Sequence, residues 1–172
     1  MEMLDIYDGR GNHIGQMDRE RAHEPGVGVF YKCVHIWIID DGRVLVQKRA
    51  RCKREYPNKW DMAVAGHIDA GESPLNAAER EVFEEIGMRI PVTKFDFMGE
   101  ILGASGNEYH QIYLIEMPIK RREMKLARNE VAAVKWLPFD KFNELFHSAK
   151  FVPHNEAYKD MVIEIIKRFS GK

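Results

Sequence analysis

Three glutamates stand close together in the stretch of sequence that is richest in potential chemistry. Glu81, Glu84 and Glu85 are three and four residues apart, so on a helix they share one side. The same helix would have an apolar stripe formed by Leu75, Ala78, Val82 and Ile86. Clustered carboxylates repel one another, and a hard cation such as Mg²⁺ offsets that repulsion with oxygen ligands. The spacing therefore indicates a metal site, and the alternative for such a cluster is a solvated acidic face.

A longer pattern surrounds this helix. From Gly66 to Met88 the chain reads GHIDAGESPLNAAEREVFEEIGM, and it resembles the Nudix signature at every fixed position. Those positions are, in order, Gly66, Glu72, Arg80, Glu81, Glu84, Glu85 and Gly87. Similarity continues into the flanking segments and covers most of the chain. The sequence is thus identified as a member of the Nudix hydrolase family, with its box at residues 66–88.

This resemblance implies a fold and a reaction. The implied fold is an α/β (α+β) sandwich, with a mixed β-sheet between helices in an α/β/α arrangement. A loop–helix–loop would hold Mg²⁺, with Mn²⁺ as the alternative, and water would attack a phosphorus atom of an organic diphosphate. By family pattern, the metal ligands and catalytic carboxylates are Glu81, Glu84 and Glu85. The backbone carbonyl of Ala65 often completes such a site.

Further residues of the site follow from the same resemblance. Arg80 would orient the carboxylates through bidentate hydrogen bonds, with Gly66, Glu72 and Gly87 as structural positions of the box. Glu130 stands where many family members have a general base or an extra ligand. Glu108 is the alternative for that role, and the sequence leaves the choice open.

The N-terminal half also resembles isopentenyl-diphosphate isomerase, a relative with the same fold. The similar stretches are Arg21–His23, His35–Trp37, Lys48–Ala50, Pro57 with Trp60, and Gly66-His67. By position, some residues match the isomerase's metal ligands: His23, His67 and Glu108. Others match residues that contact the substrate diphosphate: Arg49 and Lys53. The resemblance therefore implies that Arg49, Lys53, His23 and His67 bind substrate, and for the histidines a structural hydrogen-bonding role is the alternative.

Three positions depart from the isomerase pattern. Ala65 stands where the isomerase has its catalytic cysteine. Tyr31 replaces a metal-binding histidine, and Gly106 replaces a metal-binding glutamate. The sequence therefore predicts a metal-dependent hydrolase of a nucleoside diphosphate or a nucleoside-diphosphate-linked compound. The alternatives are an isomerase-like enzyme and a non-catalytic module that senses a nucleotide.

The composition limits the class of protein. A length of 172 residues fits one Nudix hydrolase domain spanning 1–172. The 26 Lys and Arg residues balance 27 Asp and Glu residues, which gives no support to a nucleic-acid partner. No apolar run reaches the ~18 residues of a membrane span, and the N-terminus has acidic residues where a signal peptide is basic. A cytoplasmic enzyme with a small organic diphosphate as its partner is expected, and the sequence leaves open whether it forms a homodimer.

The elements that must position these residues can be read from the local patterns. Pairs of β-rich segments joined by glycine-containing turns predict strands at 3–7 with 13–17, and at 29–39 with 44–46. The basic segment 48–60 is predicted to be a loop. Ser73 as N-cap, Pro74 at the first position and Gly87 past the end delimit a helix over 73–86. Further elements are expected as strands at 62–65, 94–103, 109–117 and 131–136, and as helices at 139–147 and 154–169.

Overall fold

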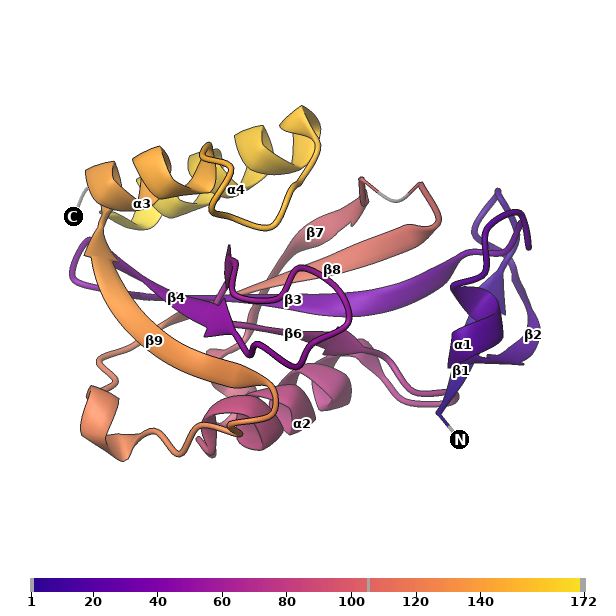
Figure 1. The fold of residues 1–172 in the computed structure, drawn as a ribbon, viewed down its shortest axis with the longest axis horizontal. Helices are drawn as coiled ribbons and strands as arrows, with labels where there is room; N and C mark the ends of the chain where they lie inside the picture. The colour runs from indigo at the N-terminus through magenta and orange to yellow at the C-terminus, as the bar shows by residue number, and fades with distance from the viewer. Residues whose placement is uncertain (1, 105, 171–172) are drawn as a thin grey trace.

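The computed structural model describes residues 2–104 and 106–170, and within these ranges the chain forms a mixed sheet covered by helices on both faces. Helix α2 (Pro74–Ile86) covers one face, and α3 (Phe139–Phe146) with α4 (Glu156–Ser170) covers the other (Figure 1). The sandwich predicted from the sequence is thus confirmed.

The sheet is built around two long parallel strands. These are β3 (Tyr31–Asp40) and β8 (Glu108–Glu116), paired from Tyr31↔Glu108 to Ile39↔Glu116. The strand order is β5-β4-β3-β8-β7, with β6 also paired to β3 and β9 also paired to β4. The remaining strands are β4 (Arg43–Arg49), β5 (Trp60–Asp61), β6 (Val64–His67), β7 (Asp96–Leu102) and β9 (Val131–Pro138).

Alternation along β3 divides the core into two layers. Val34, Ile36 and Ile38 pack toward α2, whereas Trp37 and Ile39 pack toward α3 and α4. All five side chains are buried. Strand β3 therefore contributes side chains to both core layers, the one under α2 and the one under α3 and α4.

Helix α2 has the ends predicted from the sequence. The Ser73 hydroxyl accepts a hydrogen bond from the Asn76 N–H at 3.2 Å, and Pro74 occupies the first turn, where its missing N–H costs nothing. Gly87 ends the helix at φ 69°, in the left-handed region that favours glycine, and its N–H donates to the Phe83 carbonyl at 2.9 Å. The buried face of Ala77, Ala78, Val82 and Ile86 fixes which side of the helix turns outward.

An N-terminal hairpin closes one end of the molecule (Figure 1). It consists of β1 (Met3–Tyr7) and β2 (His13–Asp18), followed by the short helix α1 (Arg19–Ala22). Strand β1 holds the loop after β6, since the N–H groups of Ala70 and Gly71 donate to the Met3 carbonyl and the Asp5 carboxylate, both at 2.8 Å. The hairpin therefore supports the loop between β6 and α2, which lies within the predicted box.

Most predicted elements are present, with small shifts at their ends. The strand expected at 62–65 lies at Val64–His67, where it pairs with β3. Strand β4 continues to Arg49, inside the predicted loop, because β9 pairs with it along its whole length. The short elements α1, β5, η1 (Val92–Lys94) and η2 (Arg121–Glu123) were not expected. In the described residues, no helix combines the length and hydrophobicity that a membrane span requires.

Candidate metal and diphosphate site

The Glu81 carboxylate lies directly against the backbone of Gly66. A Cβ atom built on Gly66 would overlap the carboxyl group of Glu81, so only glycine leaves room for it. Gly66 is the third residue of β6, and Glu81 lies in the middle of α2. The glycine at the first position of the box thus leaves the space that the Glu81 carboxylate occupies.

Arg80 connects the loop to the helix. Its Nε and Nη2 atoms donate to the two carboxylate oxygens of Glu72 at 3.0 and 2.8 Å, in a bidentate arrangement. Nη1 donates to Glu81 at 2.7 Å and to Glu84 at 3.4 Å, and Nη2 also donates to the His67 carbonyl at 2.9 Å. One guanidinium group therefore holds three carboxylates in fixed relative positions.

Glu85 is a buried carboxylate whose hydrogen-bonding partner is an amide. It is 7% exposed and accepts a hydrogen bond from Gln47 Nε2 at 2.9 Å. Burial, assisted by the charge of Glu81, raises the pKa of Glu85 well above its usual value. In the described residues, no lysine or arginine forms an ion pair with Glu85, and the buried Gln47 Oε1 atom has no hydrogen-bond partner. Because Arg80 pairs with Glu81 and Glu84 but not with the buried Glu85, this oxygen-rich cluster fits a divalent cation such as Mg²⁺ or Mn²⁺.

The protonation of Glu81 gives a pH-dependence that can be measured on the metal-free protein. Burial raises the pKa of Glu81 from 4.5 to about 7, although Arg80 opposes the shift. A carboxyl whose pKa is higher in the folded state stabilises the fold fully below the unfolded value and loses that contribution as pH rises through the folded value. Between pH 4.5 and about 7, the free energy of unfolding in chelator should therefore fall, by at most about 3 kcal/mol. Chemical denaturation across this range checks it, and Glu81→Gln should remove much of the slope. A free energy that rises equally in both proteins would contradict the assignment.

The two cations predicted to bind phosphate are each paired with an acid. Arg49 Nη1 lies 3.2 Å from Asp61 Oδ2, and its Nε and Nη2 atoms both donate to the Glu55 carbonyl at 3.1 Å. Burial raises the pKa of Asp61 to about 6, against the influence of Arg49. Lys53 pairs with Glu130, one of the two candidate bases. These pairs bring the basic segment next to the acidic site.

The isomerase-like residues form a second group, beside the end of β6. The His23 and His67 rings are 5.0 Å apart, and the Tyr31 ring is 4.7 Å from His23. His67 lies 3.4 Å from Glu2 and 4.0 Å from Glu108. The structure therefore brings together His23, His67 and Glu108, the three residues matched to isomerase metal ligands.

Glu108 differs sharply from Glu81 in its protonation. Burial alone would raise the pKa of Glu108, but the hydrogen bond from His110 and the charges of His110 and His67 outweigh it and lower this pKa to about 2. His110 Nε2 lies 3.2 Å from the Glu108 carboxylate. Glu108 is thus a carboxylate held firmly in its charged form.

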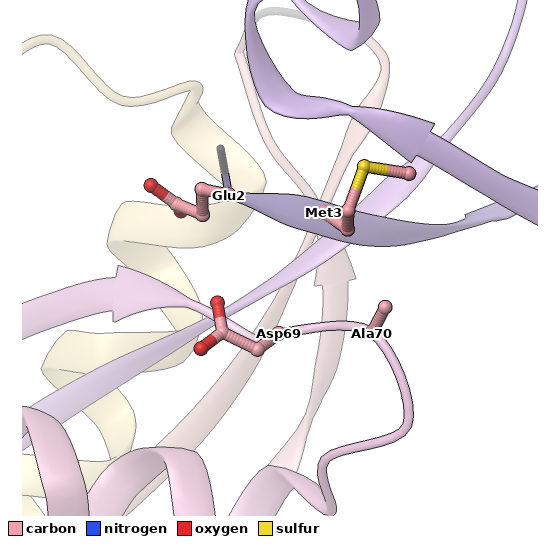
Figure 2. A pocket seen from close by; sticks show the side chains of 4 residues that line it. All are labelled: Glu2, Met3, Asp69 and Ala70. Atoms are coloured by element: carbon pink, nitrogen blue, oxygen red, sulfur yellow. The ribbon is translucent and has the colours of Figure 1, made fainter.

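A shallow pocket lies next to this group, where β1 crosses the loop after β6. Figure 2 shows its lining residues, Glu2, Met3, Asp69 and Ala70, with the carboxylates of Glu2 and Asp69 on the same side. Both acids already have basic neighbours, since Glu2 pairs with Arg19 and His67 and Asp69 lies 3.9 Å from Arg80.

Three residues of the two groups, Gln47, Asp61 and Glu2, were not predicted from the sequence. Gln47 on β4 donates a hydrogen bond to Glu85 on α2, 38 residues further along the chain, and nothing in its local spacing predicts that contact. Asp61 stands alone between Trp60 and Met62, and Glu2 lies near the start of the chain. For Asp61, an isolated acidic residue next to an apolar stretch is a sequence signal that could have indicated a functional position.

Known proteins resemble this chain over most of its length. The family model described as the NUDIX domain matches residues 30–160. A Nudix hydrolase of Listeria innocua is 33% identical over 159 residues, which cover 90% of each chain. Nudix hydrolase 3 of Arabidopsis thaliana is 30% identical over 168 residues, but the match spans 22% of that longer protein. An isopentenyl-diphosphate Delta-isomerase of Streptomyces coelicolor is 36% identical over 87 residues, half of this chain and 44% of the isomerase.

Solved structures share the fold at low sequence identity. DR0079 from Deinococcus radiodurans has a TM-score of 0.70 at 18% identity and is covered over 98% of its length. The NUDIX domain of Shewanella oneidensis NrtR, complexed with ADP ribose, has a TM-score of 0.62 at 16% identity, with 99% of that chain covered. A bifunctional NMN adenylyltransferase/ADP ribose pyrophosphatase from Francisella tularensis, with AMP and a Mn ion, has a TM-score of 0.60 at 17% identity, with 42% covered. Together with the complete box at residues 66–88, the family match shows that this chain belongs to the Nudix hydrolase family.

Proposed function

We propose that the chain is a single Nudix domain that hydrolyses the diphosphate linkage of a nucleoside diphosphate or of a nucleoside diphosphate joined to another group. The observation that carries the proposal is a cluster of three carboxylates: Glu81 and Glu84 share the Arg80 guanidinium, Glu81 lies against the backbone of Gly66, and Glu85 is buried beside Gln47. Two proteins of the same fold were solved in complex with AMP and a Mn ion or with ADP ribose, which supports a nucleotide-derived substrate.

Each part of the site has a proposed role. Glu81, Glu84, Glu85 and the Ala65 carbonyl would hold the cation, and Mg²⁺ is proposed as that cation, with Mn²⁺ as the alternative. When bound, such an ion supplies Lewis-acid stabilisation of the charge on the diphosphate oxygens. Arg80 orients the carboxylates, and Glu72 in turn holds Arg80.

Glu130 is the better candidate for the general base. A base must accept a proton from the attacking water, so a very low pKa disfavours Glu108. Glu130 is partly exposed, with 34% of its side-chain surface accessible, and it is paired with Lys53. We propose that Glu130 takes this proton while the anhydride oxygen leaves with one of the two phosphate products, and that Lys53 and Arg49 contact the substrate diphosphate.

A hydrolysis screen tests the proposal. Purified protein would be assayed with Mg²⁺ or Mn²⁺ against nucleoside di- and triphosphates, nucleotide sugars, dinucleotides and isopentenyl diphosphate. Turnover of one class that is absent in Glu85→Gln would support the hydrolase and identify its substrate class. No turnover, together with tight nucleotide binding, would replace it with a sensing module.

Arg49→Ala is expected to raise KM more than it lowers kcat. A cation that contacts phosphate in both the ground and transition states contributes uniform binding, and its loss appears mainly in KM. Steady-state kinetics on the substrate found in the screen measures the split, with circular dichroism as a check because Asp61 loses its partner. Arg54→Ala, at an exposed position of the same loop, is the matched control. An unchanged KM in Arg49→Ala would remove Arg49 from the substrate site.

An isoprenoid diphosphate isomerase is the second candidate. It is favoured by the proximity of His23, His67 and Glu108 and by the partial match to the Streptomyces isomerase. Ala65 lacks the thiol expected of that enzyme. Isomerisation of isopentenyl diphosphate by the wild type, or by Ala65→Cys, would favour this candidate over the hydrolase.

A further inference from the structure

Three side chains that commonly bind metals meet in the interior, on the face of the sheet opposite α2. They are Cys33 and His35 on β3 and His110 on β8, and they are 3%, 6% and 4% exposed. One potential ligand atom from each lies within 4.8 Å of the other two. None of the three belongs to the acidic box or to the substrate residues assigned above. We call them the Cys–His cluster.

The parallel pairing of β3 and β8 creates the cluster. Cys33 and His110 are register partners, and His35 lies two residues further along the same face of β3. The rings of His35 and His110 are stacked, with centroids 3.8 Å apart. The backbone therefore fixes the three ligand atoms near one another without any metal.

Each histidine of the cluster has an outer hydrogen-bonding partner. His35 Nδ1 lies 2.7 Å from the Tyr158 hydroxyl, and His110 Nε2 lies 3.2 Å from Glu108. Histidines that bind metals are typically held in this way, with one nitrogen on a carboxylate or other polar group and the second free to coordinate.

The second nitrogen of His110 is buried and unsatisfied. Within the described residues, His110 Nδ1 has no hydrogen-bond partner, and neither has Nε2 of His154, which borders the cluster at 5.8 Å from the His35 ring. A buried polar atom without a partner is unfavourable and rare in native proteins, so it calls for a ligand. This orphaned nitrogen is independent of the proximity of the three residues, and it indicates the same site.

We propose that Cys33, His35 and His110 bind one transition-metal ion of the Zn²⁺ class, separate from the acidic Nudix site. Thiolate and imidazole ligands suit Zn²⁺ and Co²⁺, whereas the carboxylates of the box suit Mg²⁺ and Mn²⁺. Binding replaces the thiol proton of Cys33, which passes to solvent, and no electron is transferred. Three protein ligands leave a fourth position for a solvent molecule.

Binding requires a small contraction of the cluster. Zinc–nitrogen and zinc–sulfur bonds of about 2.0–2.3 Å place tetrahedral ligand atoms about 3.3–3.6 Å apart. Ligand atoms that start up to 4.8 Å apart must therefore approach by about 1 Å. Because the lone pair of an imidazole nitrogen lies in the plane of its ring, the stacked rings of His35 and His110 must also rotate so that one nitrogen of each points at the ion.

Cobalt titration of the whole protein tests the proposal. In chelator-treated wild type, a thiolate-to-cobalt charge-transfer band should appear and correspond to one Co²⁺ per chain, and carboxylate ligands cannot produce this band whether or not they also bind Co²⁺. Cys33→Ser should lose that band. Cys52→Ser, which changes the exposed second cysteine, should keep it, and so should Glu85→Gln, in which the Nudix site is altered. The result does not depend on whether the protein hydrolyses diphosphates.

X-ray absorption on zinc-loaded wild type gives a test that needs no variant, in case Cys33→Ser does not fold. The expected spectrum has one sulfur ligand at about 2.3 Å and two or more nitrogen or oxygen ligands at about 2.0–2.1 Å. A shell made only of oxygen and nitrogen would overturn the proposal. It would equally be overturned by a wild type without the cobalt band, or by a band that persists in folded Cys33→Ser.

Discussion

Replacing Glu85 by glutamine is expected to lower kcat/KM for diphosphate hydrolysis by roughly 10²–10⁴-fold, the range observed for positioned carboxylates in catalysis. Glutamine keeps the shape and the hydrogen-bonding capacity toward Gln47 but removes the charge that a cation requires. The measurement is initial rates at saturating Mg²⁺ and, separately, the apparent Kd for Mn²⁺.

The same substitution should not destabilise the metal-free protein. Burial raises the pKa of Glu85, so the charged form is unfavourable in the fold and its removal is neutral or stabilising. Thermal unfolding in chelator should show a Tm equal to or above that of the wild type. Glu79→Gln, at an exposed position of α2 that is not one of the fixed residues of the signature, is the matched control and should keep normal activity. Near-normal turnover in Glu85→Gln would refute its role as a ligand.

Gly66→Ala is expected to reduce activity about as strongly as Glu81→Gln, by roughly 10²-fold or more. The backbone of Gly66 is not in the left-handed region, so alanine is tolerated locally. Its methyl group would instead occupy the place of the Glu81 carboxylate. Because that carboxylate ends a flexible side chain, it can swing aside, and the cost should fall on activity more than on stability.

A double-mutant cycle separates this explanation from general damage. If Gly66→Ala acts by displacing Glu81, adding Glu81→Gln should cause little further loss, since the two changes remove one interaction. Gly9→Ala, where a Cβ would meet the Phe30 ring at an ordinary 3.6 Å, is the control for a glycine substitution. Fully multiplicative losses in the double variant would contradict the shared mechanism.

The pKa values of Glu81 and Glu108, which lie in two neighbouring groups, are shifted in opposite directions, and this difference agrees with the roles proposed for them. Glu81 has a pKa raised to about 7 by burial, whereas the pKa of Glu108 is lowered to about 2 despite burial, through His110 and His67. For Glu81, the ion pair with Arg80 does not offset the effect of burial, so a bound cation would stabilise its charged form. Glu108 already has its counter-charges, which is why it serves better as a structural partner of histidines than as a base.

The sequence by itself determined the acidic helix and its loop. Every residue of the box lies within one continuous segment, and helical spacing, the Ser73 cap and the Gly87 end all act over a few residues. The exclusion of a side chain at Gly66 is encoded in the same segment, because β6 and α2 are joined by a single short loop. Local physical preferences were enough to specify this part of the site.

Only the tertiary structure decided which distant residues meet. Gln47 reaches Glu85, Lys53 pairs with Glu130, and Cys33 with His35 faces His110 through contacts between residues 38 to 77 positions apart. Such contacts depend on the order of the strands and on the parallel register of β3 and β8. The hydrophobic pattern of each strand shows which face is buried, but it does not show which strand lies beside it. Burial then set the protonation of these groups, because the loss of water around a charge depends on the whole packed core and not on neighbours in sequence.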